Sequence, residues 1–436
     1  MKNCTLFLLF FLCAFVSMRV LNAQTQFSNE INSEIVDKKS ESLLPGFNAI
    51  QQKTGVLSET DDLEIKIGGD LQFDIRYSLN DASSLINDFY LRRARLNLEG
   101  KFQKIFGFRI RPNFAGSKLN MQDAYLDIKP VESLGIRAGK FKSPVGLELL
   151  QSATNLMFVE LSLTNNLVPN RDLGVLLSGS FLGGTINYQT GLFNGVIDGS
   201  NSEGDDSNDK SFVARLFLQP FKQSELKILN GFGVGIGSSF ETKTGTLIDP
   251  QLPSYKSAGR QTFFKYRSTS GDAEATVLAV GKYNRLSPQA YFYAGRFGLL
   301  TEYVLVNQNV TIGANSAELT NSAYQVAVSF LLTDDKASYK GVTPQVSFSP
   351  ADGTWGAFEL AFRYNALQVD EDAFPVYADD SKYPSETKGW AVGLNWYLNA
   401  FYKIVLNYES TQFTGIDGSK IIEDENILLL RFQFAY

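Results

Sequence analysis

The sequence contains no histidine, and its two cysteines, Cys4 and Cys13, both lie within the first 23 residues. Histidine is the most common general base in enzymes and a frequent metal ligand. Its absence excludes Ser-His-Asp hydrolysis, Cys-His catalysis and histidine-based zinc sites. We therefore expect a protein that is not an enzyme and that uses no cofactor and no metal ion.

The sequence also has no long apolar run, and the run at Thr5–Val16 is a short one. A membrane-spanning helix needs about 18 or more consecutive apolar residues. The charged Lys2 before this run and the small Ala23 after it indicate a secretory signal peptide, which we place at residues 1–23. A lipoprotein anchor at Cys13 is the rival, disfavoured by the bulky residues before it. Cleavage of the signal would remove both cysteines, so we expect no disulfide in the mature chain.

Basic residues are in the minority, and the formal net charge is -6. Removing Lys2 and Arg19 with the signal takes the charge to -8, which makes nucleic acid an unfavourable partner. The 436 residues include 36 Gly, 34 Phe and 19 Tyr. An exported, glycine- and aromatic-rich chain without a spanning helix is typical of a transmembrane β-barrel. A secreted β-sandwich shares this composition, so composition leaves both open.

The last ten residues, 427–436, favour the barrel. Large apolar residues at Leu428, Leu430, Phe432 and Phe434 alternate with positions that include Arg431 and Gln433. This period of two indicates a strand with one apolar and one polar face. In a soluble domain such an aromatic edge strand would promote aggregation, whereas a closed barrel has no edge and turns its apolar face to lipid.

The same alternation recurs along residues 61–436, for example over Leu63–Leu79 and Tyr90–Phe102. These runs are longer than the roughly 5–6 residues of an ordinary strand. Short and long connections also alternate, as in outer-membrane barrels. The spacing predicts an all-β, antiparallel transmembrane barrel of about 16 strands, within a range of about 14 to 18. Residues 24–60 would form a polar extension in the periplasm.

One connection differs from the others, because it is apolar. About thirty residues separate a strand at Leu134–Phe141 from one at Asp172–Phe181, and they include Val145, Leu147 and Leu149. A segment this apolar should not lie free in water. Counted from a periplasmic N-terminus it is the third external loop. We predict that it folds into the barrel, packs on the inner wall and narrows the pore, with a short helix within residues 146–153.

Several short motifs resemble the phosphate-selective porin O and P family. They are Arg-Arg-Ala-Arg-Leu at 92–96, Asp-Ala-Tyr-Leu at 123–126, Gly-Lys-Phe-Lys-Ser-Pro at 139–144, Arg-Asp-Leu-Gly-Val at 171–175 and Gly-Leu-Phe-Asn-Gly at 191–195. The matches run in order over roughly residues 60–436. The resemblance implies an outer-membrane porin of 16 strands, usually trimeric, with an inward third loop and an anion path lined by bases. It would allow passive diffusion of small hydrophilic solutes, with phosphate among its small-anion partners.

Eleven bases are candidates for the pore lining and the anion path, seven by strand position and four, at 137, 140, 142 and 171, because they flank the inward loop. They are Arg93, Arg95, Arg109, Arg111, Arg137, Lys140, Lys142, Arg171, Arg363, Lys403 and Arg431. Arginine suits phosphate because its planar donors bind oxygens in pairs, and a row of weak sites permits release. We also expect Arg431→Ala to alter conduction and nothing else.

Alternatives to an anion path remain open, because acids are also predicted to face inward. They are Asp70, Asp74, Glu99, Asp123, Asp127, Glu302 and Glu359. These acids could pair with the bases and stabilise the wall, which favours a general or cation-tolerant porin. A non-conducting structural barrel, plugged by its inward loop, is a further alternative.

The predicted location is the bacterial outer membrane, with its lipids as partners. We expect a homotrimer, inserted by the barrel assembly machinery, which would recognise the terminal aromatics Phe434 and Tyr436.

Overall fold

The computed structural model describes residues 56–59, 62–80, 87–201, 204 and 208–436. Two units divide the chain at residue 54, and the described residues all belong to the second. The predicted signal peptide, 1–23, lies outside the described residues, as does most of the predicted extension at 24–60.

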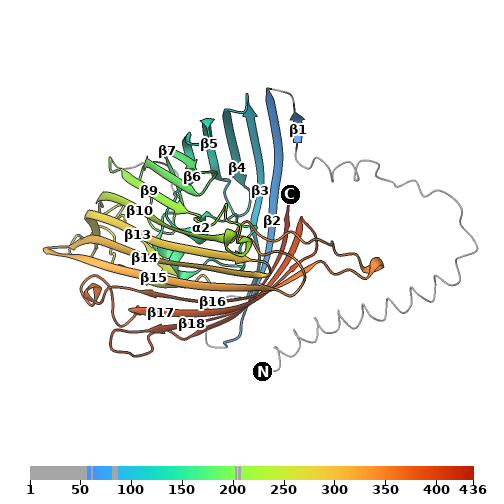
Figure 1. Ribbon diagram of the computed structural model, residues 1–436. Helices are drawn as coiled ribbons and strands as arrows, with labels where there is room; N and C mark the ends of the chain where they lie inside the picture. Colours follow the sequence, from blue (N-terminus) through green and yellow to red (C-terminus); the bar gives the residue numbers. More distant parts are fainter. Residues whose placement is uncertain (1–55, 60–61, 81–86, 202–203, 205–207) are drawn as a thin grey trace, which may run out of the picture. The chain divides into compact units, whose positions relative to one another are not determined.

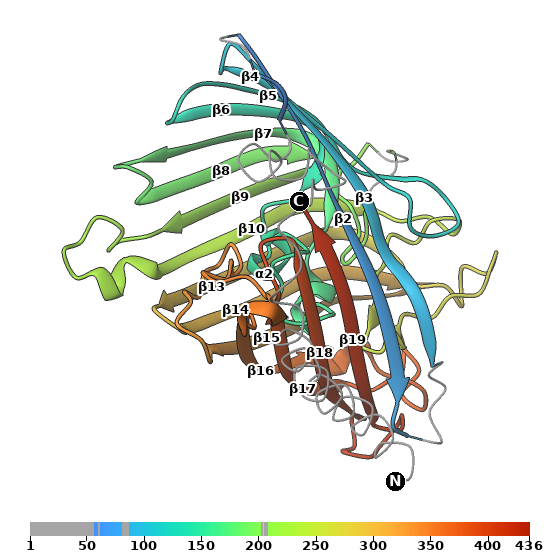
Figure 2. The ribbon, with the colours of Figure 1, turned by 90° about the vertical axis from the view of Figure 1, so that its right-hand side faces the viewer.

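Sixteen antiparallel strands within the described residues form one closed barrel (Figures 1 and 2). Each strand pairs with its neighbours in the chain, and the last pairs with the first. They are β2 (Leu63–Ser78), β3 (Asp88–Phe102), β4 (Phe106–Asn113), β5 (Asn120–Val131), β6 (Leu134–Lys142), β7 (Arg171–Phe181), β8 (Ile186–Phe193), β9 (Ser211–Leu218), β10 (Phe232–Thr244), β13 (Leu278–Ala294), β14 (Phe297–Ile312), β15 (Asn315–Leu331), β16 (Ala357–Gln368), β17 (Glu386–Tyr397), β18 (Tyr402–Thr414) and β19 (Glu425–Ala435). The predicted fold class and strand number are confirmed.

The barrel closes where β19 pairs with β2, from Ile427 opposite Ser78 to Ala435 opposite Asp70. Tyr436 extends this pairing by exchanging two backbone hydrogen bonds with Gly69, each 3.1 Å long. Beyond that point β1 (Val56–Glu59) pairs with the first residues of β2. The aromatic end of the chain therefore lies at the seam of the barrel.

The wall is apolar outside and polar inside, as the alternation predicts. Phe73 and Leu96 are 38% and 50% exposed, whereas Gln72 and Asp74 on the same wall are fully buried. In water this arrangement would be unfavourable, but in a bilayer the exposed apolar side chains contact lipid. The polar side chains line the interior, where they find partners or water.

The two ends of the barrel differ in their connections. At the short-turn end, residues 103–105, 132–133, 182–185, 295–296 and 398–401 join successive strands. Gln103 and Lys104 have φ of 51° and 60°, the left-handed conformation that a tight hairpin turn requires. Most connections at the opposite, long-loop end are longer, although only residues 313–314 join β14 to β15.

Two connections at the short-turn end are long. Residues 219–231 contain the 3-10 helix η2 (Lys227–Gly231), and residues 332–356 contain η3 (Pro350–Asp352). At the long-loop end, residues 245–277 carry the hairpin β11 (Ser254–Lys256) and β12 (Thr262–Lys265), and residues 369–385 carry η4 (Glu371–Ala373).

The inward loop, residues 143–170, joins β6 to β7 and lies inside the ring of strands (Figure 2). It contains α2 (Leu147–Leu150) and η1 (Leu163–Leu167). Val145, Leu147 and Leu167 are fully buried. The prediction that the third loop folds inward, packs on the wall and includes a short helix is confirmed. No helix in the described part of the chain has the length and apolarity to cross a bilayer.

Candidate functional site

The inward loop is fixed to one half of the barrel wall. A buried loop has backbone groups that need partners, and inward side chains of the wall supply them. The backbone N–H of Leu147 donates to Glu302 on β14 at 2.6 Å, and the N–H of Val159 donates to Asn407 on β18 at 2.7 Å. Other wall side chains donate to carbonyls of the loop: Gln72, Gln289, Asn395, Lys403 and Gln433. The loop thus covers the wall from β13 through β19 to β2.

Charged groups reinforce this attachment. Arg363 on β16 is 1% exposed and contacts Glu148 of the loop at 3.4 Å and Glu409 of β18 at 3.0 Å. It also donates to the carbonyl oxygen of Glu160 at 2.9 Å. Several charge-assisted bonds therefore hold the loop in one place.

On β3, the strand next to β2, Arg92 binds the carboxylate of Glu160 with two hydrogen bonds of 3.2 Å. Burial raises the pKa of Glu160, but the guanidiniums of Arg92 and Arg431 outweigh burial and hold that pKa at about 2. Glu160 is therefore ionised at physiological pH. Through Glu160 the loop therefore contacts β3 as well as the wall that it covers.

The wall that the loop leaves uncovered borders three cavities. The outer cavity, about 310 Å³, lies toward the long-loop end, and the central cavity, about 410 Å³, lies beside it. Lys142 and Arg171 line both. The inner cavity, about 390 Å³, lies toward the short-turn end and shares Gln189 with the central cavity. The three cavities therefore follow one another along the wall from β3 to β10.

Among the described residues, all the charged side chains that line the outer cavity are basic. They are Arg92, Arg93, Arg95, Lys142 and Arg171. Arg93 donates to Gln72 at 2.5 Å, and Lys142 donates to the carbonyl oxygen of Gln151 at 2.5 Å. Neither of these two bases forms an ion pair within the described residues. No carboxylate within the described residues therefore holds either side chain.

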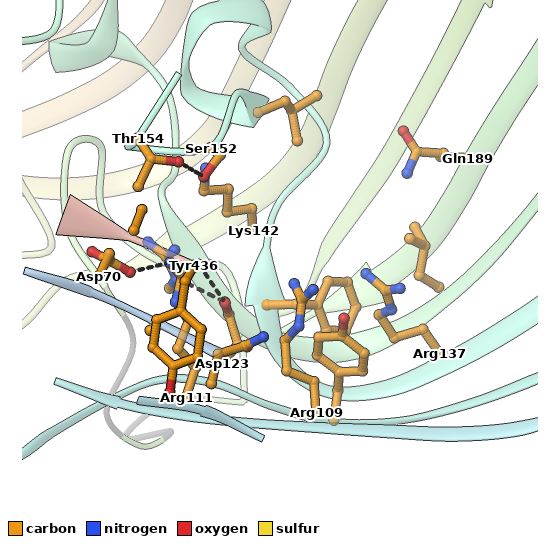
Figure 3. Close-up of a pocket in the computed structure, with 18 residues that line it drawn as sticks. Asp70, Arg109, Arg111, Asp123, Arg137, Lys142, Ser152, Thr154, Gln189 and Tyr436 are labelled. Atoms are coloured by element: carbon orange, nitrogen blue, oxygen red, sulfur yellow. Dashed lines mark hydrogen bonds and ion pairs between the residues drawn. The ribbon is translucent and has the colours of Figure 1, made fainter. Parts of the chain in front are cut away.

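The central cavity combines bases with paired acids (Figure 3). Arg111 pairs with Asp70, and the Nε of Arg171 donates to Asp123 at 2.9 Å. Arg137 binds the carboxylate of Asp127 with bonds of 2.7 and 3.0 Å.

Across the outer and central cavities, bases outnumber the acids that pair with them. The eight bases are Arg92, Arg93, Arg95, Arg109, Arg111, Arg137, Lys142 and Arg171. Their five carboxylate partners are Asp70, Glu99, Asp123, Asp127 and Glu160. The formal excess among these described residues is three positive charges.

The structure separates the predicted pore-lining bases into groups. Seven border the outer or central cavity: Arg93, Arg95, Arg109, Arg111, Arg137, Lys142 and Arg171. Arg363 and Arg431 are buried between wall and loop, and Lys403 binds the loop carbonyl of Leu156 at 2.7 Å. Lys140 is buried on β6, in register with Ala124 and Leu173.

Sequence reasoning missed Arg92, which strict alternation turns outward. The pairing of β3 with β2 skips from Arg93 to Leu91, so that Arg92 is an extra, bulged residue. Both adjacent arginines then find inward partners, Arg92 at Glu160 and Arg93 at Gln72. The signal was the arginine pair itself, since two neighbouring charges in a lipid-facing strand are costly unless a bulge turns both inward.

One acid of the β8–β9 link, at the long-loop end, is buried. Asp198 is 3% exposed and accepts hydrogen bonds from Arg285 at 2.5 Å and from the Tyr283 hydroxyl at 2.6 Å. Arg285 also pairs with Glu241 at 2.6 Å. This cluster ties the β8–β9 link to the wall, and Asp198 adds nothing to the charge of the outer mouth.

Comparison with known proteins agrees with this architecture. Residues 65–436 match the model of the family described as phosphate-selective porin O and P. Porin O of Pseudomonas aeruginosa is 23% identical over 412 residues, which cover 89% of this chain and 92% of that protein.

Solved structures share the fold at low identity. The outer membrane channel DcaP of Acinetobacter baumannii has a TM-score of 0.55 at 12% identity, covering 88% of this chain and all of that chain. An anion-selective porin from Comamonas acidovorans has a TM-score of 0.52 at 10% identity, covering 86% of this chain and 100% of that one. The trimer form of OmpT of Vibrio cholerae has a TM-score of 0.50 at 8% identity, with coverage of 86% and 100%.

Proposed function

Because this chain belongs to the phosphate-selective porin O and P family, we propose that small anions cross it along the basic wall, from the outer to the inner cavity. The chain is an outer-membrane porin that provides passive diffusion of small hydrophilic solutes. Its family and fold are those of channels rather than of enzymes. The short-turn end faces the periplasm, as it does in outer-membrane barrels.

The observation that carries the proposal is the outer cavity, where five bases and no acid line the described wall. Guanidinium groups bind phosphate oxygens in pairs, and desolvation strengthens each contact. The inward loop covers the opposite half of the wall, so a solute must pass the bases. Because each base already has a protein partner, an anion exchanges partners from one base to the next and is not trapped.

The bases under the loop have a different proposed role. Arg363, Lys403 and Arg431 hold the loop and the wall together instead of contacting solute. The alternative of a general porin rests on the five paired carboxylates, which cancel much of the positive charge. Ion selectivity measurements distinguish the two.

Lys142→Glu should shift selectivity strongly, because Lys142 lies where the outer and central cavities meet. The wild-type porin should show a reversal potential of the sign that indicates anion preference in a planar bilayer with a KCl gradient. The variant should lose most of that preference, since it places an acid among the bases that line both cavities. Phosphate against chloride in the same set-up would measure phosphate preference.

Lys227→Glu is the matched control, because Lys227 is exposed on η2 and borders none of the three cavities. Its reversal potential should equal that of the wild type. A wild-type preference for cations would refute the anion path and leave a general porin.

We also propose that three copies assemble, as in the trimer form of OmpT. The proposed signal peptide at 1–23 and the periplasmic extension at 24–60 precede the barrel at 61–436. Native mass measurement of the detergent-purified protein would identify the number of chains in the assembly.

Phe434→Ala should reduce the yield of inserted barrel, because Phe434 lies beside the seam. Its ring packs 4.9 Å from that of Tyr402 and 5.7 Å from that of Tyr436. The proposed role of Phe434 and Tyr436 in recognition by the assembly machinery adds to this packing. Heat-dependent gel mobility of outer-membrane fractions measures the folded yield. If refolding in detergent is normal while insertion in cells falls, recognition and not packing is affected.

A further inference from the structure

The inner cavity differs in chemistry from the other two. Its lining includes the aromatic rings of Tyr188, Phe217, Tyr291 and Tyr339. It also includes the side-chain amides of Asn187, Gln189 and Gln219 and the guanidinium of Arg215. Lys129 of β5 and Glu132 of the β5–β6 turn also line it. A phosphate ladder requires no aromatic surface, so this lining calls for a separate explanation.

The rings form a continuous platform. Tyr339 comes from the long connection at 332–356 and stacks on Tyr291 of β13, with ring centroids 4.9 Å apart and planes at 21°. Phe217 of β9 lies 5.1 Å from Tyr291. The Tyr339 hydroxyl donates to the carbonyl oxygen of Leu147 at 2.7 Å, which fixes the ring against the inward loop. The cluster is therefore held in place, with Phe217 buried and Tyr291 and Tyr339 half-buried, so an apolar ligand face can pack against the two tyrosines.

Arg215 adds a charge that no acid neutralises. Its Nε and Nη2 donate to the amide oxygen of Gln289 at 3.1 and 3.0 Å, and its Nη1 lies 3.5 Å from the amide oxygen of Gln189. Its guanidinium lies 4.5 Å from the centroid of the Phe217 ring. Within the described residues Arg215 forms no ion pair. A guanidinium held by neutral oxygens in a half-buried site attracts an anionic group.

The amides complete the site. Gln219 donates from Nε2 to the Tyr291 hydroxyl at 3.0 Å, and Asn187 donates from Nδ2 to the carbonyl oxygen of Gly184 at 2.8 Å. Side-chain amides can both donate to and accept from the hydroxyl groups of a solute. A volume of about 390 Å³ is within the range of small-molecule sites. The aromatic rings suit an apolar face, the amides suit hydroxyl groups, and the guanidinium of Arg215 suits an anionic group. Together they match one kind of solute.

We propose that the inner cavity is a binding site for a monosaccharide that carries an anionic group, such as a sugar phosphate. The sugar ring packs against the stacked pair of Tyr291 and Tyr339, and the phosphate binds Arg215. The alternative explanation is purely structural: the rings only anchor the connection at 332–356. That explanation accounts for Tyr339 but not for the unneutralised Arg215 beside open space. This proposal depends on the proposed anion path in one respect: the solute must also cross the central cavity.

Single-channel recordings in a planar bilayer test this site. Glucose 6-phosphate added at the periplasmic side should cause resolved, transient current blocks, whereas inorganic phosphate and glucose at the same concentration should cause much shorter ones. Tyr291→Leu and Arg215→Gln should each shorten the block by about tenfold, and Tyr291→Phe, which keeps the ring, should preserve it.

Arg137→Gln is the control, because Arg137 lines the central cavity and not the inner one. It should reduce anion preference in the reversal potential without shortening the blocks. Blocks that are equal for glucose 6-phosphate and inorganic phosphate, that survive both inner-cavity substitutions, or that shorten equally in Arg137→Gln would overturn the proposal. Reversal potentials in the same recordings test the anion path independently.

Discussion

Replacement of residues 145–168 by a short glycine-serine linker should raise single-channel conductance by about two- to fourfold, because a barrel of 16 strands encloses an aqueous lumen when nothing fills it. The loop now covers the wall from β13 to β2 through bonds such as Leu147 N–H to Glu302. Its removal would hydrate that half of the lumen. Anion preference should fall at the same time, since ions would no longer be confined to the basic wall.

Shortening residues 416–421 is the control for this deletion. This external link is mostly exposed at the long-loop end, with Ile416 44% exposed, and makes no contact of the kind that fixes the inward loop. Its loss should leave conductance unchanged. Heat-dependent gel mobility would establish that both variants are folded. A folded loop deletion with wild-type conductance would show that the loop does not limit passage.

The wall could be predicted from the sequence because strand alternation depends only on neighbouring residues. Leu96 and Arg95 occupy opposite faces whichever strands pair with β3. The apolar composition of the inward loop likewise revealed its burial, since Val145 and Leu147 have no stable place in water. The chain therefore carries its fold in local patterns.

The division of the bases into path and anchor could not be predicted. Arg137 and Arg363 are both inward arginines on alternating strands, and nothing local distinguishes them. The difference arises from a third element, the inward loop, which packs over Arg363 and leaves Arg137 open. The bulge at Arg92 was also invisible to strict alternation. The inner cavity depends on Tyr339, which comes from the long connection at 332–356 and contacts the inward loop, and no local pattern predicts that contact.

Arg431 and Arg137 form the same kind of cross-strand pair at very different depths. Arg431 binds Asp74 with two bonds of 2.7 and 2.6 Å, and the two side chains are 2% and 0% exposed. Arg137 binds Asp127 with two bonds of 2.7 and 3.0 Å, and those side chains are 34% and 31% exposed. The bond lengths of the two pairs are nearly equal, so a comparison of the two pairs isolates the effect of burial.

Arg431→Met should therefore lower the free energy of unfolding by about 3–5 kcal/mol, because Asp74 would keep a buried charge without its partner. Arg137→Met should cost only about 0–1 kcal/mol, because water solvates the exposed Asp127. Urea unfolding in lipid vesicles, followed by tryptophan fluorescence, gives both values. The sequence alone led to the expectation that loss of Arg431 alters conduction and nothing else. If that expectation is right, the two variants should be equally stable. The double variant Arg431→Met with Asp74→Asn should recover part of the loss, since the stranded charge and not the missing bond dominates the cost.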